Sequence, residues 1–498
     1  MFEYSGWLTT LLFAADWLIR LGLAVRVIMR RLPVGVALAW LSVVLIFPLA
    51  GALVYLFLGE YRLGHRRRQR IAAAQEQWLR LLHDALPQSG ALPQPGAATK
   101  PGASPVEHKA RPSQIARLGQ SALLAPPLPG NHLELLAGAD AAFPAMIAEI
   151  DRAQTSCDLE FYIWFPGGRA DEVEAALIRA AARGVRCRVL VDALGSKSFL
   201  KRGRAAQLRR QGVQVQAALQ SSLLTLSFVR PDLRMHRKIM VIDRQVGFTG
   251  SMNLADPHYF KQEAGVGQWV DALVCVRGPA VHALAASFLA SWSVETGVVA
   301  EEAEWFEDAL TLTPVGPASV QVLGSGPALR VEGIEQVVLM AVYSARRELT
   351  LTTPYFVPSE SLHTALLSAA ASGVAVTLIL PARVDSRLVQ YASRAYQSDL
   401  VAAGVRVALY EGGLLHTKSI TVDDELSLFG SLNLDPRSLR LNFEITLAIE
   451  DAEFTGVLKQ LQKTYLDQSR TLDPDACRQQ PALLRLTENT ARLLGPVL

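Results

Sequence analysis

Hydrophobic positions are densest near the N-terminus of this 498-residue chain. Residues 7–29 form an apolar segment with three charges, of which Asp16 and Arg20 stand four apart and can pair on one helix face. Residues 34–58 form a second apolar segment of 25 residues without a charge, long enough for a tilted spanning helix. Because the connection between the two segments is short, residues 1–60 predict a transmembrane helical hairpin whose ends emerge on the same side.

Basic residues follow the second segment at once, within a helical pattern over residues 61–86. The arginines of this cluster are Arg62, Arg66, Arg67, Arg68 and Arg70. The positive-inside rule places such a cluster, and the chain that follows it, on the cytoplasmic side. The same charges can gather anionic lipid. Residues 87–115 are rich in Pro, Gly, Ala and Ser and predict a flexible linker.

From about residue 116 the pattern changes to short apolar strands that alternate with amphipathic helices, and it occurs twice. The first copy, residues 116–310, predicts helix 140–153, strand 158–164, helix 171–183 and strand 185–191. The second copy, residues 311–470, predicts helix 333–345, strand 348–353, helix 359–372 and strand 374–380. Such alternation indicates an α/β fold in which helices cover a mixed or parallel sheet.

The chain ends in an amphipathic tail, residues 471–498, with a helical pattern over 481–494. Leucines at positions 483, 486, 493 and 494 give this helix an apolar side, which either docks on the domain or contacts the bilayer.

Composition and charge narrow the possible functions. The net charge is only +3, and basic stripes with interleaved aromatic residues are not evident, so we predict no nucleic-acid partner. The four cysteines lack C-x-x-C spacing and are predicted to be free thiols, mostly buried. The nine histidines show no metal-binding spacing, and we predict neither a metal site nor another cofactor.

The strongest chemical signal is the pattern H-x-K-x4-D-x6-G-S-x-N, which occurs twice with identical spacing. Its first copy comprises His236, Lys238, Asp243, Gly250, Ser251 and Asn253, and its second comprises His416, Lys418, Asp423, Gly430, Ser431 and Asn433. An apolar run typical of a buried strand follows each lysine. Alternate residues of a strand share a face, so each histidine and its lysine are expected to point the same way. Two such halves would surround one phosphate.

This repeated pattern resembles the phospholipase D superfamily, and its surroundings resemble bacterial cardiolipin synthases. The resemblance extends to residues 265–269 (GVGQW), 353–358 (TPYFVP), 411–416 (EGGLLH) and 435–444 (DPRSLRLNFE), and it covers nearly the whole chain. It implies two pseudo-symmetric phospholipase D-like α/β/α repeats that form one site. It also implies a bacterial inner-membrane protein whose lipid partners are phosphatidylglycerol and cardiolipin. The sequence does not indicate an oligomeric state.

The chemistry of a phosphodiester explains these residue types. A neutral imidazole can attack phosphorus, and a second, protonated imidazole can protonate the leaving oxygen. The resemblance favours His236 as the nucleophile and His416 as the acid and base, although the near symmetry leaves these roles open. Lys238 and Lys418 stabilise the phosphoryl charge. Further phosphate donors are predicted at Asn253, Asn433, Ser251 and Ser431.

Carboxylates complete the predicted site. The resemblance places one downstream of each motif, and Asp271 and Glu444 are expected to hold the histidine tautomers. Asp243 and Asp423 belong to the motif and are grouped with the catalytic set, although the resemblance implies a structural role for them. The basic residues Lys261, Arg437 and Arg440 are candidates for contacts with a lipid headgroup.

The resemblance therefore implies a cardiolipin synthase that works through a phosphohistidine. A phospholipase D-type hydrolase with water as the acceptor fits the motifs equally well. A non-catalytic membrane scaffold is the third interpretation, and two intact sets of His, Lys, Asn and carboxylate argue against it.

Overall fold

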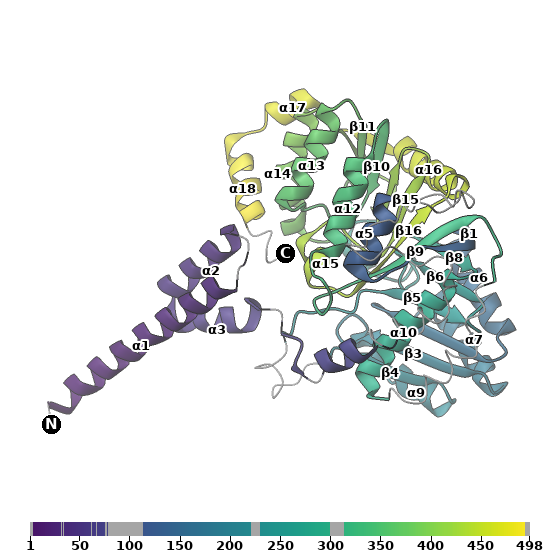
Figure 1. Cartoon of the computed structure of the whole chain (residues 1–498), viewed down its shortest axis with the longest axis horizontal. Coiled ribbons are helices and arrows are strands. Elements are labelled where there is room, and N and C mark those ends of the chain that lie inside the picture. Colours follow the sequence, from purple (N-terminus) through teal and green to yellow (C-terminus); the bar gives the residue numbers. More distant parts are fainter. Residues whose placement is uncertain are drawn as a thin grey trace, which may run out of the picture. The chain divides into compact units, whose positions relative to one another are not determined.

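The structure is a computed structural model that describes residues 3–30, 32, 34–60, 62–65, 67–74, 77, 113–220, 230–298 and 313–493 (Figure 1). The chain divides into two compact units. The first comprises residues 1–66 and 221–233, and the second comprises residues 67–220 and 234–498. Most of the predicted linker 87–115 and much of the predicted helix 61–86 lie outside the described residues, although residues 67–74 are helical as expected.

The first unit contains three helices, α1 (Glu3–Met29), α2 (Val34–Ile46) and α3 (Pro48–Leu58). The prediction of one continuous helix over 34–58 was wrong, because the backbone leaves the helical conformation at Phe47 (φ −120°, ψ 77°). Proline has no backbone N–H, so a new helix begins at Pro48, where no intrahelical donor is required. The predicted pair of Asp16 and Arg20 is present, with a distance of 2.8 Å between Oδ2 and Nε.

Within the part of the chain that the structure describes, no helix combines the length and the apolar character needed to cross a membrane. The three helices expose many large apolar side chains, among them Trp7, Leu11, Leu12, Phe13, Trp17, Leu18, Leu38, Ile46, Leu49 and Leu53. Charged groups pair at one end of the unit, where Nη2 of Arg26 and of Arg30 lie 2.9 and 3.0 Å from Oε2 of Glu60.

The second unit is built on one sheet of 15 strands in the order β17-β12-β11-β10-β14-β15-β16-β9-β1-β8-β6-β5-β2-β3-β4. The strands of the first repeat are β1 (Leu128–Ala137), β2 (Ser156–Phe161), β3 (Arg186–Asp192), β4 (Gln214–Ala218), β5 (Lys238–Ile242), β6 (Val246–Gly250) and β8 (Ala272–Arg277). Those of the second are β9 (Ala318–Ser325), β10 (Glu348–Thr352), β11 (Ala375–Pro381), β12 (Arg406–Tyr410), β14 (Ser419–Val422), β15 (Leu426–Gly430), β16 (Glu444–Glu450) and the edge strand β17 (Ser469–Thr471).

The sheet order shows the duplication directly. The strands of one repeat read from the seam as β1-β8-β6-β5-β2-β3-β4, and those of the other read as β9-β16-β15-β14-β10-β11-β12. The two series have the same connectivity and meet where β1 and β9 pair antiparallel, with Leu128 opposite Val320. The motif strands β5 and β14 hold equivalent positions, each between an antiparallel hairpin partner and β2 or β10. The prediction of two α/β repeats around a mixed sheet is confirmed.

Helices cover both faces of the sheet (Figure 1). The first repeat contains α6 (Gly138–Arg152), α7 (Arg169–Ala182), α8 (Lys197–Lys201), α9 (Arg204–Arg210) and α10 (Ala280–Thr296), and the second contains α12 (Gly333–Ser344), α13 (Glu360–Ala371), α14 (Arg387–Ala402), α15 (Pro436–Arg440) and α16 (Ala452–Asp467). Side chains of α10 and α16 enter one continuous core with strands of both repeats. The paired helices α6 and α7, and α12 and α13, cover separate cores. The cysteines are free, and three of the four are buried, as expected.

The ends of the second unit differ in part from expectation. Residues 113–115, predicted as linker, belong to the start of α5 (Gln114–Leu123), because the Ser113 side chain accepts a hydrogen bond from the backbone N–H of Ala116 and caps this helix. At the C-terminus, α17 (Pro474–Arg478) and α18 (Ala482–Leu493) follow β17. Helix α18 docks on α14, where Ala491 packs with Ala392. Docking is thus confirmed, while Leu483, Leu486 and Leu493 remain exposed.

Candidate active site

The histidine and lysine of each motif lie at the start of equivalent strands. His236 precedes β5 and is 7% exposed, and His416 precedes β14 and is 2% exposed. Nζ of Lys238 donates to the backbone oxygen of His236 at 2.7 Å, and Lys418 makes the same bond to His416 at 2.5 Å. Burial lowers the pKa of Lys238 to about 8 and that of Lys418 well below its usual range. These hydrogen bonds hold each lysine in place. An anion nearby would favour the charged form of each lysine, which burial disfavours.

A short backbone pairing between the repeats positions the second histidine. Strand β13 (Leu414–Leu415) runs parallel to β7 (Trp269–Val270), and the backbone N–H of His416 donates to the oxygen of Val270 at 2.8 Å. The next residue along, Asp271, therefore lies beside this histidine. The distance between Nδ1 of His416 and Oδ1 of Asp271 is 2.7 Å.

The first histidine is held in the same way by the second repeat. A parallel bridge joins Met235 to Phe443, and the backbone N–H of His236 donates to the oxygen of Phe443 at 2.9 Å. The following residue, Glu444, brings its Oε2 within 2.8 Å of Nδ1 of His236. Each histidine thus receives its carboxylate from the other repeat, a crosswise arrangement that the order of residues along the chain does not reveal.

The serines of the motif support these carboxylates. The Ser431 hydroxyl donates to Oε2 of Glu444, and Asn442 donates to Oε1 of the same carboxylate at 3.1 Å. Ser251 forms the equivalent hydrogen bond with Asp271. Both serines have no exposed surface and do not line the cavity. Ser251 and Ser431, predicted as phosphate donors, therefore lie behind the carboxylates, which they contact by hydrogen bonds.

One cavity joins the two halves of the site. Its volume is about 240 Å³, and it is lined by both histidines and by Asn253 and Asn433. Aromatic rings flank the histidines, since the Tyr162 ring centre lies 4.8 Å from that of His236 and the Trp269 ring centre 4.4 Å from that of His416. Further residues around the cavity are Ile163, Arg234, Lys261, Tyr355, Val357, Ser386, Val389, Asp435, Arg437, Ser438 and Asn442.

Burial sets the protonation of the histidine–carboxylate pairs. It lowers the pKa of both His236 and His416 to about 4, although the carboxylates act in the opposite direction. Burial, the largest single effect, raises the pKa of Asp271, but the charges of His416 and Lys418 and the hydrogen bonds from His416 and Ser251 together outweigh it, and the value falls to about 2. The pKa of Glu444 is lowered as well, because the effects of His236, Lys238 and Ser431 together outweigh that of burial. At neutral pH each pair therefore holds a neutral imidazole beside an ionised carboxylate.

The two aspartates of the motif lie elsewhere. Asp243 follows the far end of β5 and accepts hydrogen bonds from the backbone N–H groups of Gln154, Thr155 and Ser156 at 2.7–2.8 Å. Asp423 binds three N–H groups of residues 346–348 in the same way. Neither residue lines the cavity. The structure thus places Asp243 and Asp423, which the sequence grouped with the catalytic set, where their carboxylates tie a turn to the start of a neighbouring strand.

The basic residues predicted to meet a headgroup separate into three cases. Arg437 lines the cavity. Lys261 also lines it, but its Nζ lies 2.9 Å from Oδ2 of Asp385. Arg440 does not line it and pairs with Glu335 at 3.3 Å. Arg234, which sequence reasoning missed, joins Arg437 at the cavity. Arg234 stands two residues before His236, and this spacing could have indicated that its side chain reaches the site.

Tyr162, Tyr355 and Asp435 were also missed, because they lie outside the repeated pattern. Tyr355 donates to Oδ1 of Asp385 at 2.7 Å. Burial raises the pKa of Asp435 to about 6, and its carboxylate caps α15 by accepting from the backbone N–H of Ser438.

Comparison with known proteins identifies the family of this chain. The family described as "Cardiolipin synthase, PLD-like domain" matches residues 146–288 and 338–465, one segment in each repeat. "Cardiolipin synthase A" of Citrobacter koseri is 40% identical over 482 residues, which are 97% of this chain and 97% of that protein. The protein of the same name from Edwardsiella ictaluri is 41% identical over 482 residues, again 97% of both chains. This chain belongs to the cardiolipin synthase family.

Two further matches complete the comparison. The family described as "Phospholipase_D-nuclease N-terminal" matches residues 19–60, within the first unit. The crystal structure of phosphatidylserine synthase from Haemophilus influenzae Rd KW20 aligns over 78% of this chain and 100% of its own, with a TM-score of 0.56 and 15% identity. This likeness shows a shared fold. The resemblance to cardiolipin synthases of the phospholipase D superfamily, inferred from the two motifs, is confirmed.

Proposed function

We propose that this member of the cardiolipin synthase family transfers a phosphatidyl group from one phosphatidylglycerol to another. The products are cardiolipin and glycerol. The observation that carries the proposal is the convergence of two neutral histidines, each paired crosswise with a carboxylate, on a single cavity of about 240 Å³. Two equivalent imidazoles suit a reaction of two equivalent displacements at one phosphorus.

In the first displacement, Nε2 of His236 attacks the phosphorus of the donor lipid and the bond from phosphorus to the glycerol oxygen breaks. Protonated His416 gives its proton to that oxygen, and glycerol leaves. In the second, the free hydroxyl of another phosphatidylglycerol loses its proton to His416 and attacks phosphorus, which releases His236. The hydrogen bond from Nδ1 of each histidine to its carboxylate leaves Nε2 for these steps.

His416 takes up this proton from solvent as the phosphodiester anion binds, because burial by itself favours a neutral imidazole. A phosphodiester anion in the cavity favours the imidazolium and also the charged forms of Lys238 and Lys418. These lysines, with Asn253 and Asn433, would stabilise the phosphoryl oxygens as charge develops. The asparagines suit this role, since both line the cavity and the Nδ2 group of each amide is a hydrogen-bond donor. Oδ1 of Asn253 accepts from the backbone N–H of Ile163 at 3.1 Å, which orients that side chain.

The second lipid also carries a phosphate, which needs a cationic contact of its own. Arg234 and Arg437 line the same cavity and are suited to that contact, since guanidinium groups bind phosphate with two parallel hydrogen bonds. Water in place of this second lipid would give phosphatidic acid, so occupancy by the acceptor decides between transfer and hydrolysis.

We also propose that α1–α3 anchor the protein in the bacterial cytoplasmic membrane, with the second unit on the cytoplasmic side. The support is the large number of exposed apolar side chains on these helices and the arginine cluster that follows them in the sequence. The exposed leucines of α18 offer a second contact with lipid.

The test is a product assay with purified protein and phosphatidylglycerol labelled separately in the headgroup and the acyl chains. Cardiolipin and free glycerol in equal amounts are the expected products. Phosphatidic acid without cardiolipin would show that water is the acceptor and would replace the proposal with a hydrolase.

A further inference from the structure

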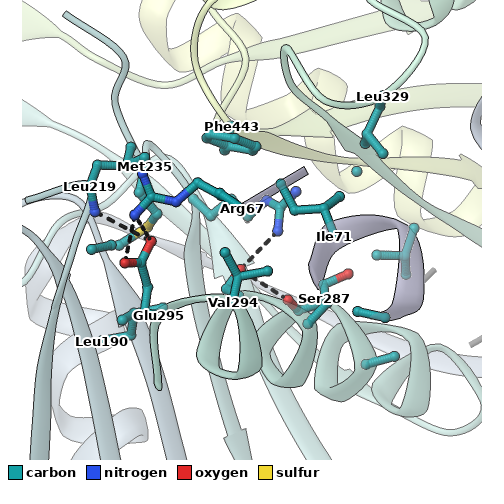
Figure 2. Close-up of a pocket in the computed structure, with 18 of the residues that line it drawn as sticks. Arg67, Ile71, Leu190, Leu219, Met235, Ser287, Val294, Glu295, Leu329 and Phe443 are labelled. Atoms are coloured by element: carbon teal, nitrogen blue, oxygen red, sulfur yellow. Dashed lines mark hydrogen bonds and ion pairs between the residues drawn. The ribbon is translucent and has the colours of Figure 1, made fainter. Parts of the chain in front are cut away.

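Two cavities adjoin the segment that carries His236, and one of them suits the alcohol groups of the reaction. The cavity in Figure 2 has a volume of about 140 Å³ and a predominantly aliphatic lining, and its carboxylate, Glu295, pairs with Nη2 of Arg67 at 2.7 Å. The catalytic cavity, which both histidines line, is surrounded mainly by polar side chains. Hydroxyl groups need polar partners when they leave water, so recognition of the alcohol belongs to the catalytic cavity.

Three hydrogen-bonded side chains lie at the edge of the catalytic cavity. Tyr355 and Asp385 follow β10 and β11, which are parallel neighbours, so both come from the same edge of the sheet. Lys261 comes from the loop between β6 and β7, in the other repeat. Oδ1 of Asp385 accepts from the Tyr355 hydroxyl at 2.7 Å, and Oδ2 accepts from Nζ of Lys261 at 2.9 Å. One carboxylate therefore holds a hydroxyl group and an ammonium group together.

This set lies beside His416. The ring centre of Trp269, which also lines the cavity, is 4.4 Å from the ring centre of His416 and 5.4 Å from Nζ of Lys261. Burial raises the pKa of Asp385, but the hydrogen bonds from Lys261 and Tyr355 and the charges of Lys261 and His416 together lower it. The Asp385 carboxylate is therefore ionised at neutral pH and lies within electrostatic reach of His416.

The set offers hydrogen bonds that match a hydroxyl group. Lys261 and Tyr355 line the cavity, whereas Asp385 does not. An ammonium group has three donors, and a phenol that donates its proton can still accept, so Lys261 keeps donors and Tyr355 keeps an acceptor. A ligand hydroxyl both accepts and donates. A ligand ammonium only donates and would meet the like charge of Lys261. Asp435 also lines the cavity, but its carboxylate is engaged in capping α15.

Both displacements bring the same chemical group to this place. His416 protonates the leaving glycerol oxygen and later takes the proton of the entering hydroxyl, so the reacting oxygen lies next to it in both steps. The central hydroxyl of glycerol is one carbon further along in each case. In an ethanolamine headgroup, an ammonium group occupies that position instead. One pair of side chains can therefore examine the headgroup of the donor and of the acceptor.

We propose that Lys261 and Tyr355 bind the central hydroxyl of the glycerol headgroup beside His416 and exclude headgroups with an ammonium group at that position. Asp385 is the positioning residue of this set. The inference rests on the proposed transfer reaction, with His416 on the side of the alcohol. A site that hydrogen-bonds a substrate hydroxyl rejects analogues without it, because its own polar groups are then left unpaired.

The experiment lets three donor lipids compete in one mixture with the full-length protein in detergent micelles. The lipids are phosphatidylglycerol, phosphatidylethanolamine and phosphatidyl-1,3-propanediol, which lacks the central hydroxyl, and each carries an isotope in its headgroup. Mass spectrometry counts the alcohols released. The wild type should release glycerol at least about tenfold faster than propanediol or ethanolamine. Lys261→Met should bring both ratios to within about threefold of unity, because it removes the donor and the like charge.

Three further variants separate recognition from folding. Tyr355→Phe should lower the ratio of glycerol to propanediol, and Lys261→Arg should keep the ratio of glycerol to ethanolamine, since it keeps the charge. Lys463→Met breaks an exposed pair with Asp467 on α16, 2.8 Å long, and should keep both wild-type ratios. A purely structural role of Lys261 would lower all three rates alike and leave the ratios unchanged.

Unchanged ratios in folded Lys261→Met and Tyr355→Phe proteins, checked by thermal unfolding, would overturn the proposal and leave the transfer reaction standing. Cardiolipin is measured in the same mixture. Failure of the transfer reaction would appear as alcohol release without cardiolipin, whatever the ratios, so the two failures are distinguishable.

Discussion

Nδ1 of His236 lies 2.8 Å from Oε2 of Glu444, a residue 208 positions later in the chain and in the other repeat. His416 and Asp271 form the mirrored pair at 2.7 Å. Each repeat therefore supplies one histidine and the carboxylate for the opposite histidine. A single repeat contains all the residue types of the site but neither of its functional pairs.

The crosswise pairing predicts which residues are energetically coupled. In double-mutant cycles on the free energy of unfolding, His236→Ala and Glu444→Gln should couple by about 0.5–3 kcal/mol, the range for residues in direct contact. The matched cycle of His236→Ala with Asp271→Asn should show a clearly smaller coupling. A larger coupling in that second cycle would contradict the arrangement.

The two histidines are expected to differ in a trapping experiment. His236→Ala and His416→Ala should each reduce cardiolipin synthesis by at least about 10³-fold, since each removes a nucleophile or a proton donor. Rapid acid-free quenching of the wild type with acyl-labelled phosphatidylglycerol should yield a covalent adduct on His236. An adduct found on His416, and retained in His236→Ala, would reverse the two roles.

The motif aspartates should affect folding far more than chemistry. Asp243→Ala removes the acceptor for three backbone N–H groups, and we expect a loss of about 1–3 kcal/mol in the free energy of unfolding. Asp243 also has a positive φ of 49°, a conformation that Asn tolerates better than Ala, so Asp243→Asn is the milder control.

Activity per folded molecule should stay near the wild-type value in both aspartate variants. A large loss of activity in a fully folded Asp243→Asn protein would restore this residue to the catalytic set. Asp423→Ala and Asp423→Asn provide the same test in the second repeat.

Acid should destabilise the protein through the buried histidines. Their pKa is about 4 in the folded state and ordinarily 6.5, so the unfolded chain takes up protons first as the pH falls. Their contribution to stability is complete above pH 6.5 and is lost between pH 6.5 and 4, at up to about 3 kcal/mol for each histidine. The midpoint of thermal unfolding, measured across this range, should fall less steeply in the double variant His236→Gln, His416→Gln. An identical slope would contradict the assignment.

The leucines of α18 predict a second contact with lipid. Leu483, Leu486 and Leu493 are 76%, 63% and 79% exposed and lie on one side of the helix. Replacing all three with serine should weaken binding to phosphatidylglycerol vesicles in a flotation assay, because burying each leucine contributes about 1.5–3 kcal/mol at most. Turnover in detergent micelles should persist. Asn489→Ser is the polar control on the same helix, and equal vesicle binding by the triple variant would exclude this contact.

Much of the second unit could be predicted from the sequence. Helices and strands such as α6, α7, β10 and β11 begin and end within two to three residues of expectation, because apolar periodicity and helix-ending glycines such as Gly184 and Gly373 are local signals. The duplication was equally visible, since the same spacing occurs at His236 and His416. These features depend on residues close together in the chain, where pattern and structure are directly linked.

The sequence by itself thus determined the two repeats, the family and the identity of both histidines and their carboxylates. Only the tertiary structure decided how these groups pair, because β7 and the Met235–Phe443 bridge join the repeats through contacts between residues 145–208 positions apart. The tertiary structure also shows that Ser251 and Ser431 lie behind the carboxylates and that Asp243 and Asp423 lie away from the cavity. A sequence motif shows which residues occur together at fixed spacing. Packing between distant segments decides on which side of the sheet, and at which end of a strand, each of these residues lies.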